Sequence, residues 1–126
     1  IDVVLRGARD LSDDWKRVVA VFQPNRYNRM NTMSPAYRDA FVRADLVVVT
    51  EIYASGTTPI PGVTGKLVVD AIRAAHPTTK VEWIADRRDL VTYLAGELRD
   101  GDLCISMGCG DIESLPDEVI AARERR

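Results

Sequence analysis

Four predicted strands, of which the first two are rich in apolar β-branched residues, constrain the fold of this chain most strongly. They occupy residues 17–22, 46–52, 80–85 and 103–107, and segments with a helical spacing of apolar residues separate them. The apolar runs in the first two segments are typical of strands that are buried on both faces of a parallel sheet. The alternation of such strands with helices predicts an α/β fold: a Rossmann-like three-layer domain with a mainly parallel sheet and right-handed crossovers.

The segments between these runs predict where the helices begin. The chain opens on a helical pattern, and Ser34 followed by Pro35 is a good helix start, with a hydroxyl at the cap and proline at the first helical position. Thr64 and Asp86 can cap two further helices. The polar residues 23–33, which include a proline and three asparagines, are predicted to form a long loop.

Size and composition limit the class of protein. The 126 residues provide for one hydrophobic core, so we expect residues 1–126 to form a single domain. A charged content of 29% and a net charge of −2 give no argument for a nucleic-acid or membrane partner. No signal-peptide pattern or bilayer-spanning apolar stretch is present, so we expect a cytoplasmic location. The chain starts at Ile1, without methionine and already in a helical pattern, so we expect a cut inside a longer protein.

Residue types that usually carry catalysis or bind metals are sparse. Cys104 and Cys109 lack the spacing of a zinc site and His76 is distant from both in sequence, so we expect neither a bound metal nor a Cys–His pair. Cys104 lies in an apolar run and is predicted to be a small buried residue. Because the chain also has no P-loop and no paired carboxylates in a pocket-like setting, it supports ligand binding and positioning rather than ligand activation.

Two arginines follow the first predicted strand, at the edge where ligands bind in parallel α/β sheets. Arg26 and Arg29 lie three residues apart in the segment that begins after Phe22, and Asn25 precedes them. Planar guanidinium groups donate hydrogen bonds in pairs to carboxylate or phosphate oxygens, so this spacing indicates a site for an anion. Two solvated loop arginines would produce the same pattern.

The second and fourth predicted strands are also followed by unusual residues at this edge. Glu51 ends one strand, where it could orient an arginine, contact substrate or simply lie in solvent, and Tyr53 could pack beneath the rigid, proline-containing loop of residues 54–63. Gly108, Cys109, Gly110 and Asp111 follow the last strand. Their backbone amides can form an anion-binding nest, although the segment does not fit a dinucleotide-binding fingerprint.

These three segments together carry a resemblance to a known family. Residues 19–29 read VAVFQPNRYNR, residues 51–63 read EIYASGTTPIPGV and residues 107–112 read MGCGDI. They resemble, in order, the segments F-Q-P-H-R-(Y/F)-x-R, (D/E)-(I/V)-Y-x-A…P-(I/L)-P-G-V and M-G-A-G-D-I of the C-terminal domain of the Mur ligase family. The nearest branch is the one that joins L-alanine to UDP-N-acetylmuramic acid.

The resemblance implies a three-domain, ATP- and Mg²⁺-dependent ligase that activates the muramate carboxylate as an acyl phosphate for attack by L-alanine. A central ATPase domain would hold the P-loop and most metal ligands, so this chain alone would be inactive and would bind neither ATP nor Mg²⁺. By position, Arg26 and Arg29 would hold the substrate carboxylate or the phosphoryl charge. The backbone amides of Gly108, Cys109 and Gly110 would contact the amino-acid side of the site.

The chain departs from the family pattern at two of these positions. Asn25 stands where most relatives carry histidine, and Asn cannot become cationic near neutral pH. Cys109 replaces alanine, which exchanges one small residue for another. Residues 31–33 also resemble the murein-tripeptide ligase branch, which therefore remains an alternative. A stand-alone α/β module that binds an anion remains a second alternative.

Overall fold

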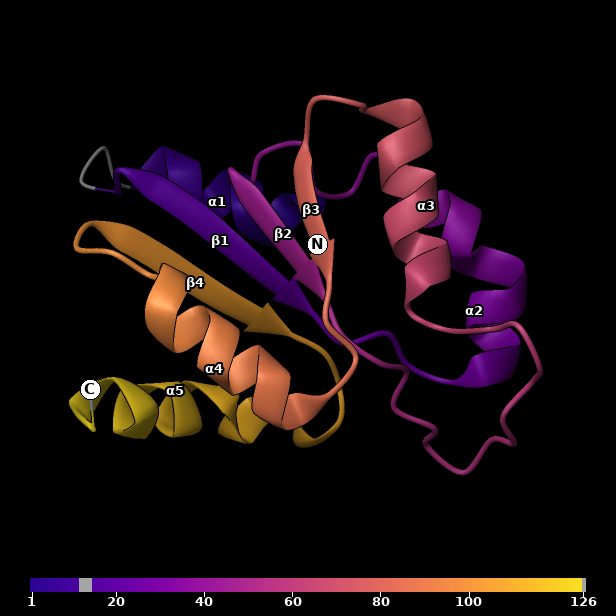
Figure 1. Cartoon of the computed structure of the whole chain (residues 1–126). Helices are drawn as coiled ribbons and strands as arrows, with labels where there is room; N and C mark the ends of the chain where they lie inside the picture. The colour runs from indigo at the N-terminus through magenta and orange to yellow at the C-terminus, as the bar shows by residue number, and fades with distance from the viewer. Residues whose placement is uncertain (12–14, 126) are drawn as a thin grey trace.

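The computed structural model describes residues 1–11 and 15–125 (Figure 1). Within these residues four strands form one all-parallel sheet in the order β3-β2-β1-β4. The strands are β1 (Arg17–Phe22), β2 (Leu46–Val49), β3 (Lys80–Trp83) and β4 (Asp102–Met107). The predicted α/β class and the four predicted strand positions are confirmed, with β2 and β3 ending earlier than expected.

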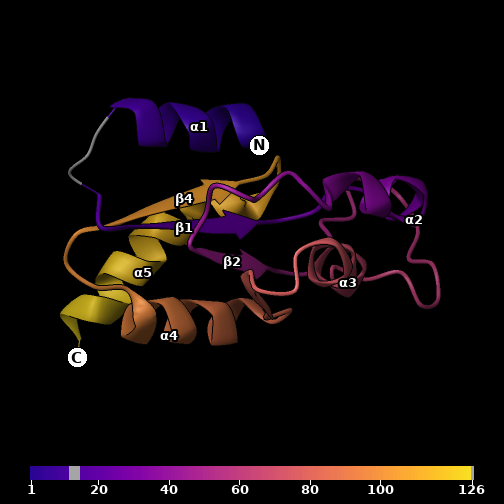
Figure 2. The same cartoon turned by 90° about the horizontal axis from the view of Figure 1, so that it is seen from above.

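Helices cover both faces of this sheet. The α-helices are α1 (Asp2–Leu11), α2 (Tyr27–Met33), α3 (Lys66–Ala75), α4 (Arg87–Glu97) and α5 (Leu115–Glu124). Residues of α1, α2 and α3 share one buried cluster with one face of the sheet, and residues of α4 and α5 share a second cluster with the other face. Figure 2 shows α1 and α4 on opposite sides of the strands. The domain therefore has three layers, as the sequence predicts.

The central strand β1 supplies both layers because successive strand residues point to opposite faces. Val18 and Ala20 belong to the cluster under α1, whereas Val19 and Val21 belong to the cluster under α4 and α5. All four side chains are fully buried. This explains why the run contains no polar alternation.

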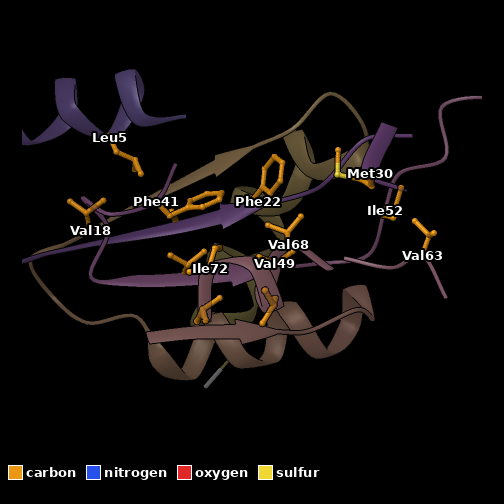
Figure 3. Packing of buried hydrophobic residues seen from close by; sticks show 14 residues of the cluster. Leu5, Val18, Phe22, Met30, Phe41, Val49, Ile52, Val63, Val68 and Ile72 are labelled. Atoms are coloured by element: carbon orange, nitrogen blue, oxygen red, sulfur yellow. The ribbon is translucent and has the colours of Figure 1, made fainter. Parts of the chain in front are cut away.

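Phe22, the last residue of β1, belongs to the first buried cluster (Figure 3). Its ring centroid lies 5.1 Å from that of Tyr37 and 5.5 Å from that of Phe41, both in tilted arrangements. These aromatic contacts fix the end of β1, so the segment after Phe22 leaves the sheet from a rigid base.

The long loop predicted for residues 23–33 is wrong, because its second half is helix α2. The side chain of Met30 is buried in the first cluster and holds this helix on the core. The helix start predicted at Ser34 and Pro35 is wrong for the same reason, because the chain is already helical when it reaches Ser34, whose amide donates to the carbonyl of Met30. Residues Ser34–Tyr37 form a short 3-10 helix (η1) instead.

The two predicted caps both accept hydrogen bonds from the start of a helix. The Asp86 carboxylate accepts from the amide of Asp89 at 3.0 Å, which confirms it as the cap of α4. The Thr64 hydroxyl accepts from the amide of Lys66 at 3.2 Å, but the N-cap of α3 is Gly65, so the prediction of Thr64 as the cap is wrong by one residue. A short polar side chain thus caps α4, whereas α3 begins at a glycine.

Cys104 is exposed, so the prediction that it is buried is wrong. It lies on β4, and β4 is an edge strand with no neighbour on one side among the described residues. Apolar side chains of α4 and α5, including Leu94 and Val119, line a shallow groove beside it. Desolvation, followed by the charge of Asp102, raises the pKa of the Cys104 thiol to about 11, which disfavours the reactive thiolate at neutral pH.

Candidate ligand-binding site

The candidate site lies at the carboxyl edge of the sheet, where β1, β2 and β4 end. Beyond β1 the chain stays extended and pairs with the chain beyond β2: the amide of Tyr53 donates to Pro24 and the amide of Arg26 donates to Tyr53, both at 2.9 Å. Because the strands are parallel, the segments that follow them come together here. This brings the three sequence motifs to one edge.

Arg26 has a backbone conformation that is unusual for a residue with a side chain. Its φ angle is 67° and its ψ angle is 124°. Its amide bonds to Tyr53, and its carbonyl accepts from the amide of Met30 at 3.1 Å, so bonds on both sides hold it there. Strained residues of this kind cost about 1–3 kcal/mol and are concentrated at functional sites. The bend at Arg26 turns the chain from the sheet into α2.

One cleft at this edge contains four of the predicted site residues. Asn25, Arg29, Gly108 and Cys109 line a volume of about 370 Å³ together with the ends of β1 and β4. The arginine comes from the motif after β1 and the glycine from the motif after β4. The structure therefore places the guanidinium and the glycine corner, defined as residues 108–111, beside the same cleft.

The polar groups of this cleft have few partners within the protein. Arg29 is exposed and makes no hydrogen bond or ion pair with the described residues. The backbone amides of Gly108 and Cys109 also have no acceptor in the described part of the chain. The side-chain oxygen of Asn25 is buried without a hydrogen-bond partner, which is uncommon in folded proteins. Arg29 and the two amides are unused donors, so the arrangement fits an anionic ligand.

At Gly108 and Gly110 of the corner, neighbouring atoms leave little space for a side chain. A Cβ atom on Gly108 would lie 3.0 Å from Cβ of Gln23 and from Cγ2 of Ile112. A Cβ atom on Gly110 would lie 2.6 Å from two ring carbons of Tyr53. The corner is therefore packed closely against the ends of both β1 and β2.

A second cleft of about 350 Å³ lies beside the first and is lined by Glu51, Tyr53 and Asp111. Glu51 does not pair with Arg26 or Arg29. Instead its carboxylate accepts from the amide of Ile52 at 2.8 Å and from the amide of Gly65 at 3.3 Å. The hypothesis that Glu51 orients an arginine is therefore wrong, and the carboxylate instead joins the end of β2 to the start of α3.

Two further residues of this region were not identified from the sequence. Gln23 is 6% exposed, lines both clefts and donates to the Asp111 carboxylate at 2.7 Å. Arg87, at the start of α4, donates to the Asp111 carbonyl at 2.8 Å and forms an ion pair with Glu118 at 2.6 Å. This arginine holds the pKa of the Glu118 carboxyl below its usual range. A polar residue directly after a buried strand is the one signal that could have indicated Gln23.

The structure thus divides the predicted residues into groups. Asn25, Arg29, Gly108 and Cys109 share one cleft, whereas Glu51, Tyr53 and Asp111 line the other. Gly110 lies against the Tyr53 ring, and Arg26 lines neither cleft. The ligand-binding roles of these residues remain predictions.

The one histidine of the chain lines neither cleft. His76 follows the last residue of α3, at the opposite edge of the sheet, and bonds to the Asp39 carboxylate at 2.7 Å, which lowers the pKa of Asp39. Among residues 1–11 and 15–125 no group of three or more His, Cys, Asp or Glu side chains could hold a metal ion. In the same part of the chain, every helix is too short or too polar to cross a membrane.

Comparison with known proteins gives consistent matches. Residues 1–110 match the family described as "Mur ligase, glutamate ligase domain". A UDP-N-acetylmuramate–L-alanine ligase from Desulfosudis oleivorans is 38% identical over 125 residues, covering 99% of this chain and 27% of that protein. One from Rubrobacter xylanophilus is 40% identical over 121 residues, covering 96% of this chain and 27% of that protein. This chain therefore spans about a quarter of the length of these relatives.

A solved structure has the same fold. It is a murein peptide ligase from Psychrobacter arcticus, which matches with a TM-score of 0.73 at 18% sequence identity. The match covers 99% of this chain and 25% of that one. At this identity the similarity establishes the arrangement of helices and strands and nothing finer.

Proposed function

Because this chain belongs to the Mur ligase family, we propose that it is the C-terminal domain of an ATP-dependent ligase that joins L-alanine to UDP-N-acetylmuramic acid in peptidoglycan precursor synthesis. The similar proteins named UDP-N-acetylmuramate–L-alanine ligase support this choice of branch. The observation that carries the proposal is the cleft that Arg29 shares with Gly108 and Cys109. Both substrates carry a carboxylate, and this cleft presents hydrogen-bond donors that have no acceptor among the described residues.

The cleft suits an anion rather than a metal ion. Its charged group is a guanidinium, and the described residues hold no cluster of metal ligands. ATP and Mg²⁺ would therefore be held mainly by a central ATPase domain, which would supply the phosphoryl group that activates the muramate carboxylate. Such a reaction would be confined to the cytoplasm, where ATP and the nucleotide-linked sugar are made.

The residues of this chain would then bind the substrates and orient them. The guanidinium of Arg29 can donate two parallel hydrogen bonds to a carboxylate or phosphoryl group. The amides of Gly108 and Cys109, which line the same cleft, can donate to the same charge. Fixed donors stabilise negative charge that develops on the reacting group, and they hold the amino acid near it. Nothing in the cleft activates a nucleophile, so the 126 residues alone are expected to show no ligation.

The first test is Arg29→Lys in the full-length ligase that contains this domain. Lysine keeps the charge but cannot form the bidentate pair, so kcat/KM for L-alanine should fall by about tenfold or more. The matched control is Arg88→Lys on the exposed side of α4, which should leave the kinetics unchanged. Equal kinetics for both variants would reduce Arg29 to a surface residue and remove the main support for the proposal.

The choice of amino-acid substrate needs a separate assay. The same enzyme is offered L-alanine or a murein tripeptide with UDP-N-acetylmuramic acid and ATP. Ligation of L-alanine supports the proposed branch, and ligation of the tripeptide alone assigns the chain to the murein-tripeptide branch. If neither is joined, a stand-alone anion-binding module becomes the better explanation.

A further inference from the structure

We propose that Gln23 is a positioning residue that holds the glycine corner at a set distance from the arginine-bearing segment after β1. The inference rests on the proposed function, because Gly108 and Cys109 of the corner line the same cleft as Arg29. Gln23 itself would not need to touch the substrate. Its effect would be exerted through the backbone amides of Gly108 and Cys109.

Both ends of the Gln23 side-chain amide are used. The Nε2 atom donates to Oδ1 of Asp111 at 2.7 Å, and the Oε1 atom accepts from the amide of Ile112 at 3.3 Å. The backbone amide of Gln23 also donates to the carbonyl of Met107 at 2.9 Å. Gln23 is 6% exposed and its bond with the Ile112 amide is buried, whereas the Asp111 carboxylate is 68% exposed. Loss of the Gln23 side-chain oxygen would therefore leave the buried Ile112 amide unpaired.

The corner has few other attachments. β4 is the edge strand, so on its outer side no described strand holds the chain that leaves it. The amides of Gly108, Cys109 and Gly110 bond to no described group. Arg87 reaches the Asp111 carbonyl from α4, but this bond joins the corner to a helix and not to the arginine segment. Among the described residues, only Gln23 links residues 111–112 by hydrogen bonds to the end of β1.

Gln23 is also well placed to transmit a displacement. It lies two residues before Asn25 on a stretch that is paired with Tyr53, and its Cβ and carbonyl oxygen lie against Gly108. It lines both clefts, so it forms part of the wall between them. A change at this side chain would therefore shift the corner amides relative to Arg29.

The hydrogen-bond pattern permits a donor–acceptor exchange as the test. Gln23→Glu has the same shape, but it places a carboxylate oxygen opposite the Asp111 carboxylate and removes the donor. Adding Asp111→Asn restores the pair in the reverse direction, because the new Asn amide donates to the new carboxylate. Asp111→Asn alone keeps an acceptor oxygen and should be mild.

The measurement is steady-state kinetics of the full-length ligase with each substrate varied in turn. We expect Gln23→Glu to raise KM for L-alanine by about tenfold, because small displacements of binding groups are costly. The KM values for ATP and UDP-N-acetylmuramic acid should stay the same. The double variant should return the KM for L-alanine to within about twofold of wild type.

A control for stability is available at Asp102, the first residue of β4, at the opposite end of the strands from the clefts. Asp102→Asn removes the carboxylate charge and one of the two hydrogen bonds that Asp102 accepts from Arg17, and it should lower Tm without changing any KM. If Gln23→Glu behaves like this control, or if the double variant is no better than the single one, Gln23 has only a structural role and the inference is wrong.

Failure of the proposed function gives a different result. In that case the wild-type enzyme joins no amino acid, and hydrogen exchange of residues 107–113 in the same proteins tests the inference alone. Faster exchange in Gln23→Glu and its reversal in the double variant support the positioning role. Unchanged exchange in Gln23→Glu overturns it.

Discussion

Two arginines flank β1, and the fold treats them in opposite ways: Arg17 is the first residue of the strand, and Arg29 lies in helix α2 beyond its end. Arg17, at the beginning of the strand, donates to both carboxylate oxygens of Asp102 at 3.1 and 2.6 Å and to the Glu97 carboxylate at 3.0 Å. Arg29, after the end of the strand, pairs with no described residue. The same residue type is thus a structural element at one edge and an unused donor at the other.

The Arg17–Asp102 pair is largely buried, and each partner shifts the pKa of the other. The side chains of Arg17 and Asp102 are 16% and 5% exposed, and Asp102 forms hydrogen bonds that raise the pKa of Arg17. The hydrogen bond from Arg17 in turn lowers the pKa of the Asp102 carboxyl. A charge that the protein has already neutralised cannot recruit an anionic ligand, whereas an unpaired one can. The comparison therefore separates arginines that stabilise the fold from those available for function.

The largest effect should come from breaking the structural pair. Arg17→Leu leaves the Asp102 carboxylate buried without its partner, which should lower the free energy of unfolding by about 3 kcal/mol. Urea unfolding of the wild-type and variant proteins measures this difference. A loss below about 0.5 kcal/mol, the range of ordinary surface substitutions, would show that the pair is not structural.

A smaller effect should come from acid. Because the folded-state pKa of Asp102 lies below its unfolded value of about 3.9, this carboxylate stabilises the protein at neutral pH. That stability is lost as the pH falls from about 5 through the folded pKa. Urea midpoints measured from pH 7 to pH 3 should fall less steeply in Asp102→Asn than in the wild type. Identical slopes would contradict the role assigned to Arg17.

The smallest effect on stability should come from the other end of the strand. Arg29→Ala removes an exposed side chain without a protein partner, so the free energy of unfolding should change by less than about 0.5 kcal/mol. Ligation should nevertheless fall, as for Arg29→Lys. If unfolding becomes easier by more than about 1 kcal/mol, Arg29 has a partner in the folded protein and the contrast with Arg17 fails.

Local sequence was sufficient where a single physical cause dominates. The apolar, β-branched runs predicted β1 and β2, whose side chains are almost all buried, because strands buried on both faces have no polar face. The side chains of β3 and β4 are more exposed. Asp86 predicted the start of α4 because its carboxylate bonds to a nearby amide, which is a contact within four residues. The motifs after β1 and β4 were expected to meet because parallel strands end at one edge, and Arg29 and Gly108 do share a cleft.

Local sequence was insufficient where a distant contact changed the outcome. The segment before Ser34 reads as a loop, yet burial of Met30 against the core makes it helix α2. Cys104 reads as buried, yet its strand is at the edge of the sheet. Neither fact is visible within a short window of residues, because both depend on which elements pack beside each other.

The residue pattern of this chain therefore established its α/β class and the position of its strands, and it predicted the edge of the sheet at which the three motifs meet. Packing in three dimensions selected the partner of each polar group at that edge. Glu51 bonds to the amide of Gly65 rather than to an arginine, and Gln23 bonds to Asp111, which is 88 residues away in the chain. Strand formation depends on neighbouring residues, whereas the choice of hydrogen-bond partner depends on distances that exist only once the sheet and its helices are assembled.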